Sequence, residues 1–413
     1  MRQETDCLIV GSGLGALTCG TLLAQRGWRV LLLTERPPED SMCWVQEGFE
    51  HDRSPDLLWG FEEKGVLHPV LAVQEGRSPV VRVQPGIQVV LSPHRVGFYG
   101  LGPVWQREIQ REFPGSWRAI LNCSERLCHL SGKIGRQKEV PILPIASWSP
   151  ARLIGRRRLR PFLEGLGLPC PFCNMVEAVA AACFHVEPCR TTVAMAAAAF
   201  GHLQRGVFAP RGGTKAFTGQ LISRFRSLGG EIREGVVGEV KRKWGAVHAV
   251  VMTHGEVVSC RYAVVESEGT PGNHVSHVLV DEALIPGEMR RNVLLVDAGP
   301  GEGAAVTAMH LAVSSADNPD DRPRQQRTVA IRMLQGPSKD MMGLLERVFP
   351  GWGRATICSV PPRRRREENI LLSYRRLRPT NLLIISHESP LGCGLSAAAR
   401  GGSRVAANLL ARA

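Results

Sequence analysis

A glycine-rich turn between two apolar runs constrains the fold of this chain more than any other feature. The turn spans residues 11–16 (GSGLGA) and follows the apolar residues 7–10. A helical pattern then leads through Gly27 to a second apolar run at residues 30–33. Short continuous apolar runs are typical of strands buried on both faces, and a glycine after a helical pattern is typical of a helix end. The order predicts a βαβ unit in an α/β fold with a parallel sheet.

The same turn has the residue types of a dinucleotide-binding site. Gly11 allows a tight turn, Gly13 lets the backbone approach a diphosphate, and Ala16 is small enough for the helix to pack against the strand. Ser12 and Gly15 complete the turn, whose free amides lie at the positive end of the helix dipole and attract phosphate. The alternative is a glycine turn that binds no phosphate.

The ribose position is less regular. An acidic side chain at the end of the second strand would hold an adenosine ribose, but that position is Thr34, and Glu35 follows one residue later. A slip of one residue turns a side chain to the other face of a strand. Either the strand ends early and Glu35 turns toward the ribose, or ribose recognition is weakened.

The C-terminal end predicts a second helix that begins at a glycine-bearing loop. Residues 381–385 form an apolar strand pattern, residues 386–394 (SHESPLGCG) form the loop, and residues 395–410 form a helix pattern rich in small side chains. A second helix N-terminus can therefore face an anion or a polarised ring.

Together these segments resemble the FAD-dependent amine oxidase and phytoene desaturase superfamily. The matching motifs are residues 11–27 (GxGxxA, then GxxLAxxG), residues 48–52 (GFEHD), residues 211–217 (RGGTKAF) with the block that follows to residue 240, and residues 381–394. The resemblance implies a Rossmann-like FAD-binding domain and, between its pieces, an inserted α+β substrate domain. It implies FAD as cofactor, held by residues that we list as Gly11, Ser12, Gly13, Gly15, Ala16, Thr34, Glu35, Val237, His387, Glu388, Gly392 and Gly394.

Two of those residues have implied roles of their own, and three positions depart from the superfamily pattern. Val237 would lie beside the adenine, and His387 would lie at the isoalloxazine edge or the ribityl chain. The strand-end acid is replaced by Thr34, the superfamily's Gly-Gly-Arg by residues 39–44 (EDSMCW), and the acid of the C-terminal Gly-Asp by His387, with Glu388 beside it.

These features support two classes of function. The first is an FAD-dependent oxidoreductase that exchanges hydride between the flavin and a hydrophobic, isoprenoid-like substrate; the cofactor carries the chemistry, so the sequence assigns no catalytic residue. The altered positions favour the second, a carrier without catalysis that resembles Rab GDP-dissociation inhibitors. An amine oxidase or an NAD(P)-binding protein on the same scaffold is a third possibility.

The motifs also predict how the domains divide the chain. We expect a discontinuous FAD-binding domain from residues 1–75, 205–285 and 355–413. Residues 76–204 and 286–354 would form the substrate domain, with strands at residues 293–296 and 328–331 and a helix at residues 340–348. A largely apolar substrate site between the two is the default expectation.

The charge balance favours anionic partners. Lys and Arg number 51 and Asp and Glu 38, for a net charge of +13. Arginines cluster at residues 152–160 and 363–378, which suits either peripheral contact with an anionic membrane or a solvated surface. Nucleic acid is not expected, because no binding motif accompanies the charge and aromatic residues are only 6%. No apolar run is long enough to span a membrane, and we expect a cytoplasmic protein.

The 12 cysteines suggest no disulfide framework. The chain is long and shows no secretory signal, so we expect mostly buried free thiols in a reducing compartment. Cys170 and Cys173 form a C-x-x-C before a predicted helix at residues 176–185, where a lowered thiol pKa could serve redox chemistry. Because the spacing of Cys183, His185 and Cys189 fits no known metal pattern, we expect no metal site and interpret these cysteines as structural.

Overall fold

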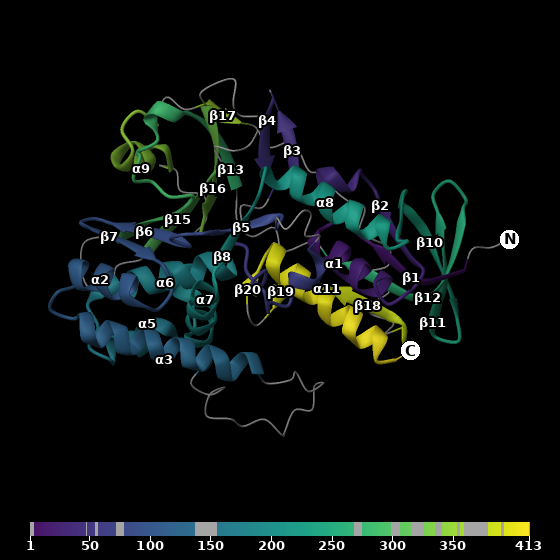
Figure 1. Cartoon of the computed structure of the whole chain (residues 1–413), viewed down its shortest axis with the longest axis horizontal. Helices are drawn as coiled ribbons and strands as arrows, with labels where there is room; N and C mark the ends of the chain where they lie inside the picture. The colour runs from purple at the N-terminus through teal and green to yellow at the C-terminus, as the bar shows by residue number, and fades with distance from the viewer. Residues whose placement is uncertain are drawn as a thin grey trace.

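The glycine-rich turn lies at the centre of a seven-stranded sheet in the computed structural model (Figure 1). The strand order is β10-β11-β12-β1-β2-β9, and β18 pairs with the carboxyl half of β12. The strands are β1 Glu4–Val10, β2 Val30–Thr34, β9 Glu231–Glu234, β10 Val237–Lys243, β11 Ala246–Met252, β12 Val257–Glu266 and β18 Leu382–Ile385. The pairs β1–β2, β1–β12, β2–β9 and β12–β18 are parallel, so the carboxyl ends of these strands meet at one edge, as predicted.

The structure describes most of the chain. The described residues are 4–46, 48–53, 57–71, 78–136, 155–267, 275–298, 306–314, 326–334, 341–352, 356–358, 379–389 and 392–412. The arginine cluster at residues 363–378 lies outside them, as do residues 152–154 of the other cluster.

The two ends of the chain pack against each other beside this sheet. Helix α1 (Leu14–Ala24) and helix α11 (Leu395–Leu410) lie side by side, with α8 (Gly213–Ser227) next to α1 (Figure 1). The approach is close: a Cβ added at Gly402 would lie 2.1 Å from the carbonyl oxygen of Gly15, and one added at Gly15 would lie 2.8 Å from the carbonyl oxygen of Ala398. The two glycines therefore allow the backbones of the helices to touch.

A second seven-stranded sheet forms the core of the other lobe. Its order is β17-β13-β16-β15-β14-β6-β7. The strands are β6 Ile87–Leu91, β7 His94–Phe98, β13 Val275–Asp281, β14 Asn292–Ala298, β15 Val306–Val313, β16 Gln326–Met333 and β17 Thr356–Cys358. The predicted strands at residues 293–296 and 328–331 are confirmed as parts of β14 and β16. Because β12 and β13 belong to different sheets, the chain passes from the first sheet to the second between residues 266 and 275. The predicted domain bounds stay a prediction.

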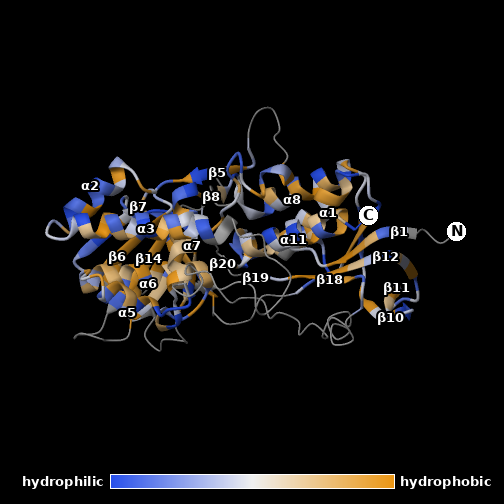
Figure 2. Ribbon diagram, turned by 90° about the horizontal axis from the view of Figure 1, so that it is seen from below, coloured by the Kyte–Doolittle hydropathy of each residue, from blue (hydrophilic) through white to orange (hydrophobic). Residues whose placement is uncertain are grey.

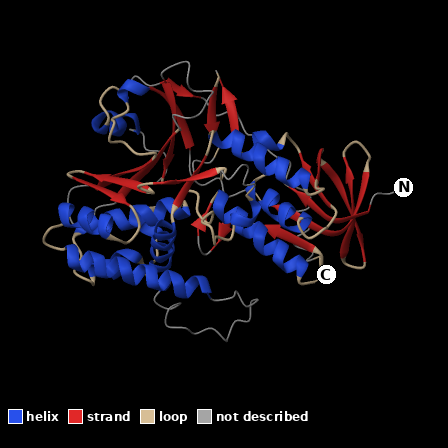
Figure 3. Ribbon diagram, viewed as in Figure 1, coloured by secondary structure: helices blue, strands red, loops and turns tan. Residues whose placement is uncertain are grey.

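Helices cover this second sheet (Figure 3). They are α2 Pro103–Glu112, α3 Trp117–Arg136, α5 Leu159–Glu164, α6 Cys170–Phe184, α7 Val193–Arg205 and, apart from the rest, α9 Met341–Val348, which confirms the predicted helix at residues 340–348. Two-stranded pairs complete the fold: β3 Cys43–Gln46 with β4 Phe49–Asp52, β5 Val80–Val83 with β8 Val207–Pro210, and β19 Glu388–Ser389 with β20 Gly392–Cys393.

Helix α6 is the most apolar helix of this lobe, as Figure 2 shows. From Phe172 to Phe184 each of its residues is buried, which is typical of a helix enclosed on all sides. Glu177 is the charged residue of that buried stretch, and it forms an ion pair with Arg160 of α5. Because an uncompensated buried charge is costly, this arginine of the 152–160 cluster compensates the charge of Glu177 rather than contributing to an open basic surface.

The C-x-x-C pair lies in the first turn of α6, earlier than the predicted helix start. Cys170 is exposed and Cys173 is buried, and burial raises the pKa of the Cys173 thiol to about 12. A thiol with so high a pKa is a poor nucleophile at neutral pH. Within the described ranges, no group of three or more His, Cys, Asp or Glu could hold a metal ion.

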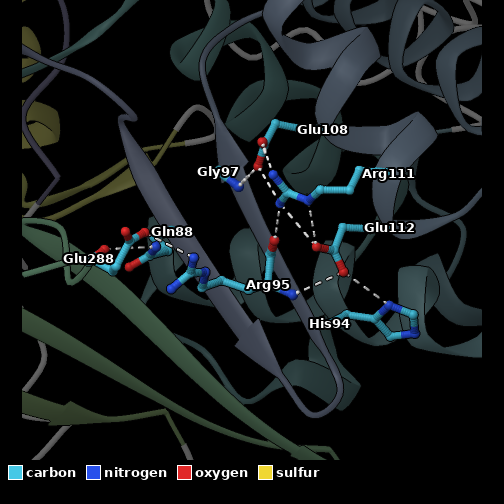
Figure 4. A network of polar contacts seen from close by, with 8 residues as sticks. All are labelled: Gln88, His94, Arg95, Gly97, Glu108, Arg111, Glu112 and Glu288. Atoms are coloured by element: carbon cyan, nitrogen blue, oxygen red, sulfur yellow. Dashed lines mark hydrogen bonds and ion pairs between the residues drawn. The ribbon is translucent and has the colours of Figure 1, made fainter. Parts of the chain in front are cut away.

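An ion network joins the β6–β7 hairpin to helix α2 (Figure 4). Glu108 accepts hydrogen bonds from the Gly97 amide and from Arg111, and Glu112 accepts from the Arg95 amide and contacts His94. These contacts fix one end of the second lobe. In the part of the chain that the structure describes, no helix is both long and apolar enough to cross a bilayer.

Candidate cofactor site at the glycine-rich turn

A glutamate side chain occupies the space above the glycine-rich turn. Glu266 is the last residue of β12, directly after the apolar residues 263–265, and parallel pairing with β1 brings it to the turn. Its Oε2 accepts a hydrogen bond from the Gly13 amide at 2.8 Å, and its Oε1 accepts from the amides of Gly15 at 3.0 Å and Ala16 at 3.3 Å. The carboxylate therefore binds the free amides at the N-terminus of α1, where an anion is favoured.

The fit around this carboxylate is tight. A Cβ added at Gly13 would lie 2.7 Å from Oε1 and 2.8 Å from Oε2 of Glu266, and one added at Gly11 would lie 2.7 Å from the Glu266 Cβ. Gly11 also has a φ of 141°, which L side chains rarely adopt. The glycines leave space beside the turn, as predicted, and the Glu266 side chain of the same chain fills that space.

The C-terminal loop reaches the same carboxylate. His387 Nε2 lies 3.4 Å from Glu266 Oε1. Burial raises the pKa of Glu266, but the contact with His387 and the hydrogen bonds from Gly13 and Ala16 outweigh it and hold the pKa below its ordinary value. Glu266 is therefore ionised at neutral pH, and it connects the N-terminal turn to the C-terminal loop.

The remaining C-terminal residues position that loop. Glu388 and Gly392 belong to the β19–β20 pair, and the Gly394 amide donates to the carbonyl oxygen of His387 at 2.9 Å before α11 begins. His387, predicted to contact the flavin, thus lies against Glu266. Of the predicted C-terminal residues, the structure places His387 at the N-terminal turn through Glu266, and the cofactor roles of His387, Glu388, Gly392 and Gly394 stay predictions.

The ribose and adenine positions lie at the end of β2. Thr34 is buried, and its hydroxyl donates to the carbonyl oxygen of Arg36 at 2.6 Å, while Glu35 is exposed. The Gly235 amide donates to the Thr34 carbonyl oxygen at 2.8 Å, so the segment that leads to Val237 lies beside the end of β2. The backbone therefore places Thr34 and Val237 in one neighbourhood, and the roles of Thr34, Glu35 and Val237 stay predictions.

A second glycine-started helix offers an internal comparison. Glu50 of β4 is buried, and its Oε1 accepts a hydrogen bond from the Lys215 amide in the first turn of α8 at 3.0 Å. A Cβ added at Gly213 would lie 3.0 Å from this carboxylate. Two helices of the first lobe, α1 and α8, are thus capped by glutamates from distant strands.

FAD, the cofactor that the resemblance implies, can be tested against this geometry. The amides of Gly13, Gly15 and Ala16 form a cradle for an anion, as a diphosphate requires. The Glu266 carboxylate fills that cradle, and a diphosphate cannot bind the same amides while it stays. In this arrangement the turn does not fit the diphosphate of FAD, although the surrounding fold does.

Glu266 is the functional residue that sequence reasoning missed. The signal that could have found it is a glutamate directly after the apolar residues 263–265 of a strand pattern. Such a strand was not assigned next to β1 from the sequence, because pairing between segments about 250 residues apart leaves no local mark.

Comparison with known proteins shows that the region around the turn is similar to a Rossmann-like domain. Residues 9–72 match the family model of the NAD(P)-binding Rossmann-like domain. Prolycopene isomerase 2 of an Oncidium hybrid cultivar is 33% identical over 85 residues, which are 20% of this chain and 14% of that protein. All-trans-retinol 13,14-reductase of Macaca fascicularis is 22% identical over 326 residues, 72% of this chain and 53% of that protein. The matches thus span at most about half of these relatives.

Solved structures match nearly the whole fold. Cyclohexylamine oxidase from Brevibacterium oxydans superposes with a TM-score of 0.59 at 11% identity and covers 99% of both chains. The Rab GDI of Plasmodium falciparum superposes with a TM-score of 0.56 at 9% identity and covers 93% of both chains. The fold is a Rossmann-like dinucleotide-binding domain with an added substrate-type domain. These findings confirm the predicted resemblance to the FAD-dependent amine oxidase and desaturase superfamily.

Proposed function

We propose that this chain is an FAD-dependent oxidoreductase of that superfamily, in which the Glu266 carboxylate lies on the amides that a diphosphate would use. The observation that carries the proposal is the convergence of the turn at residues 11–16 with the C-terminal loop and α11. One extended dinucleotide could contact both termini only in such an arrangement. FAD would supply the hydride chemistry when bound, and the residues of the chain would bind it and orient it.

The proposed substrate is apolar and of the isoprenoid class. Prolycopene isomerase and retinol reductase are named for long apolar molecules, and they share sequence with this chain. We also propose that the arginines at residues 156–158, which are exposed, favour contact with an anionic lipid surface from which such a substrate could be drawn.

Reconstitution with FAD tests the oxidoreductase. The purified chain is incubated with FAD, freed of unbound flavin, and examined for visible flavin absorbance and its bleaching by a reductant. We expect about one flavin per chain that is reduced and reoxidised. A Gly13→Leu variant is the control, because its side chain would enter the amide cradle. Flavin-free protein after this treatment would contradict the proposal.

A carrier without a cofactor is the second candidate. The Glu266 carboxylate favours it, because the amides of α1 are satisfied with no ligand. In that case the chain would bind isoprenoid lipids and stay colourless with FAD. Lipid binding by colourless protein, measured with a fluorescent isoprenoid, would support the carrier over the enzyme.

A further inference from the structure

We propose that Glu266 is an internal competitor of the cofactor: its carboxylate takes the place of the dinucleotide diphosphate and must leave before a dinucleotide binds. The inference deepens the proposed function and rests on it for the identity of the ligand. Its chemistry is the exchange of one anion for another at the same backbone amides.

The first step of the argument is that the carboxylate and a diphosphate need the same donors. Gly13, Gly15 and Ala16 donate to Glu266 through the amides that begin α1. In dinucleotide-binding turns of this type the diphosphate lies at the N-terminus of the helix and uses its free amides. Because a backbone N–H donates fully to one acceptor, the two anions exclude each other.

The second step is that the register between β12 and β1 fixes the position of Glu266 at the turn. Val265 lies opposite Val10 in the β12–β1 register, so Glu266 lies beside Gly11 at the start of the turn. Its Cβ lies so near Gly11 that any side chain there would collide with it. A small residue in place of Glu266 would leave the amides open without moving the strand.

The third step is that the carboxylate is retained from the other side. His387 comes from the C-terminal loop and contacts Oε1, and Glu266 is 6% exposed. A departing carboxylate would lose three amide hydrogen bonds and the histidine contact. The loop that contains His387 also contains residues predicted to hold the cofactor, so its position and that of Glu266 are linked.

The Glu50 contact supplies a control for ordinary helix capping. Glu50 caps α8 through the Lys215 amide, and α8 lacks the turn sequence of residues 11–16. If Glu266 served only to cap a helix, its removal would change stability as removal of Glu50 does and would leave dinucleotide affinity unchanged.

The test compares ligand affinity in four full-length proteins: the parent, Glu266→Ala, Glu266→Gln and Glu50→Ala. ADP is titrated by calorimetry as a diphosphate probe without a flavin ring, and FAD is titrated by fluorescence. We expect Glu266→Ala to bind both at least about tenfold more tightly than the parent, about 1.4 kcal/mol. Glu266→Gln keeps the volume and loses the charge, so its gain is smaller, and Glu50→Ala binds as the parent does.

The outcomes separate the inference from the proposed function. Equal affinity of the parent and both Glu266 variants, or an equal gain in Glu50→Ala, overturns the inference even if FAD binds and is reduced. A gain for ADP in the Glu266 variants without any flavin retention supports the inference and contradicts the oxidoreductase. The thermal midpoint of each variant, with and without ADP, shows that it is folded. If Glu266→Ala does not fold, Glu266→Gln decides the result.

Discussion

The N-termini of α1 and α8 both have free backbone amides that need hydrogen-bond acceptors, and the two helices meet this need in different ways. Both helices begin at glycine turns, and both receive a buried glutamate from a distant strand, Glu266 at α1 and Glu50 at α8. They differ in what else is near. Glu266 accepts from three amides and touches His387, whereas Glu50 lies within the electrostatic reach of Arg291.

We interpret this difference as the one between an ordinary helix cap and a proposed ligand site whose amides bind a carboxylate of the chain itself. A cap needs one or two hydrogen bonds to satisfy a helix end. At the α1 turn three amides donate to one carboxylate. The sequence of this turn is typical of diphosphate binding, and the turn lies where the N-terminal and C-terminal segments meet. Four changes, taken from the largest expected effect to the smallest, test whether this difference is real.

The largest effect is expected where α1 touches α11. Gly402→Ala places a methyl 2.1 Å from the Gly15 carbonyl oxygen, so the two helices must separate. We expect a loss of about 3 kcal/mol in the free energy of unfolding, at the upper end for overpacked cores. Gly219→Ala in α8 is the matched control, because nothing lies within 4 Å of its added Cβ; it should gain up to about 1 kcal/mol. Urea denaturation measures the free energy of unfolding of both variants. If Gly402→Ala were as stable as the parent, the close packing of α1 against α11 would be refuted.

Removal of each glutamate compares the two caps directly. Glu266→Ala leaves three amide donors without their acceptor, and we expect the free energy of unfolding without ligand to fall by about 2–3 kcal/mol. Glu50→Ala removes the contact with the Lys215 amide and an attraction to Arg291, and it should cost less, about 1.5 kcal/mol. Chemical denaturation of both variants shows which one loses more free energy of unfolding. A larger loss in Glu50→Ala than in Glu266→Ala would contradict the assigned difference between the two helix N-termini.

Acid should weaken the α1 contact in a defined direction. The pKa of Glu266 is lower in the folded chain than the ordinary value of 4.5. Below about pH 4.5 the unfolded chain therefore binds a proton that the folded chain does not, and stability falls as the pH falls through the folded pKa. Above this window the stabilisation is fully present. The stability difference between the parent and Glu266→Gln should shrink on going from pH 6 to pH 3, and a constant difference would contradict this assignment.

The smallest effect is expected in the ion network of Figure 4. Arg95 and Glu288 are 3.0 Å apart but 50% and 70% exposed, so solvent screens their attraction. We expect Arg95→Ala to change the free energy of unfolding by less than about 0.5 kcal/mol. A loss as large as that of Glu266→Ala would mean that burial does not decide the strength of these contacts.

Local sequence patterns were sufficient for much of the fold. The turn at residues 11–16, β2, α11, β14, β16 and α9 follow from apolar runs, glycine positions and helical spacing. The predicted meeting of the two termini is confirmed as well, because it came from a resemblance that covers both ends. These features depend on short segments or on a shared fold, and both leave marks in the sequence.

Contacts between distant residues leave much less trace in the sequence. The sheet that β13 joins depends on its pairing with β16 and β17, which its own sequence does not show, and the domain boundary at residue 285 stays a prediction. Glu266 was missed for the same reason, since only the β12–β1 register brings it to Gly13. The resemblance predicts a flavin contact for His387, but it gives no sign of the Glu266 carboxylate, whose Oε1 lies 3.4 Å from His387 Nε2.

The most direct measurement is a crystal structure of Glu266→Ala grown with ADP, beside one of the parent chain without ligand. The account predicts the diphosphate within hydrogen-bonding distance of the Gly13 and Gly15 amides in the variant, and the Glu266 carboxylate on those amides in the parent. ADP bound elsewhere, or a parent in which Glu266 points away from the turn, would contradict it.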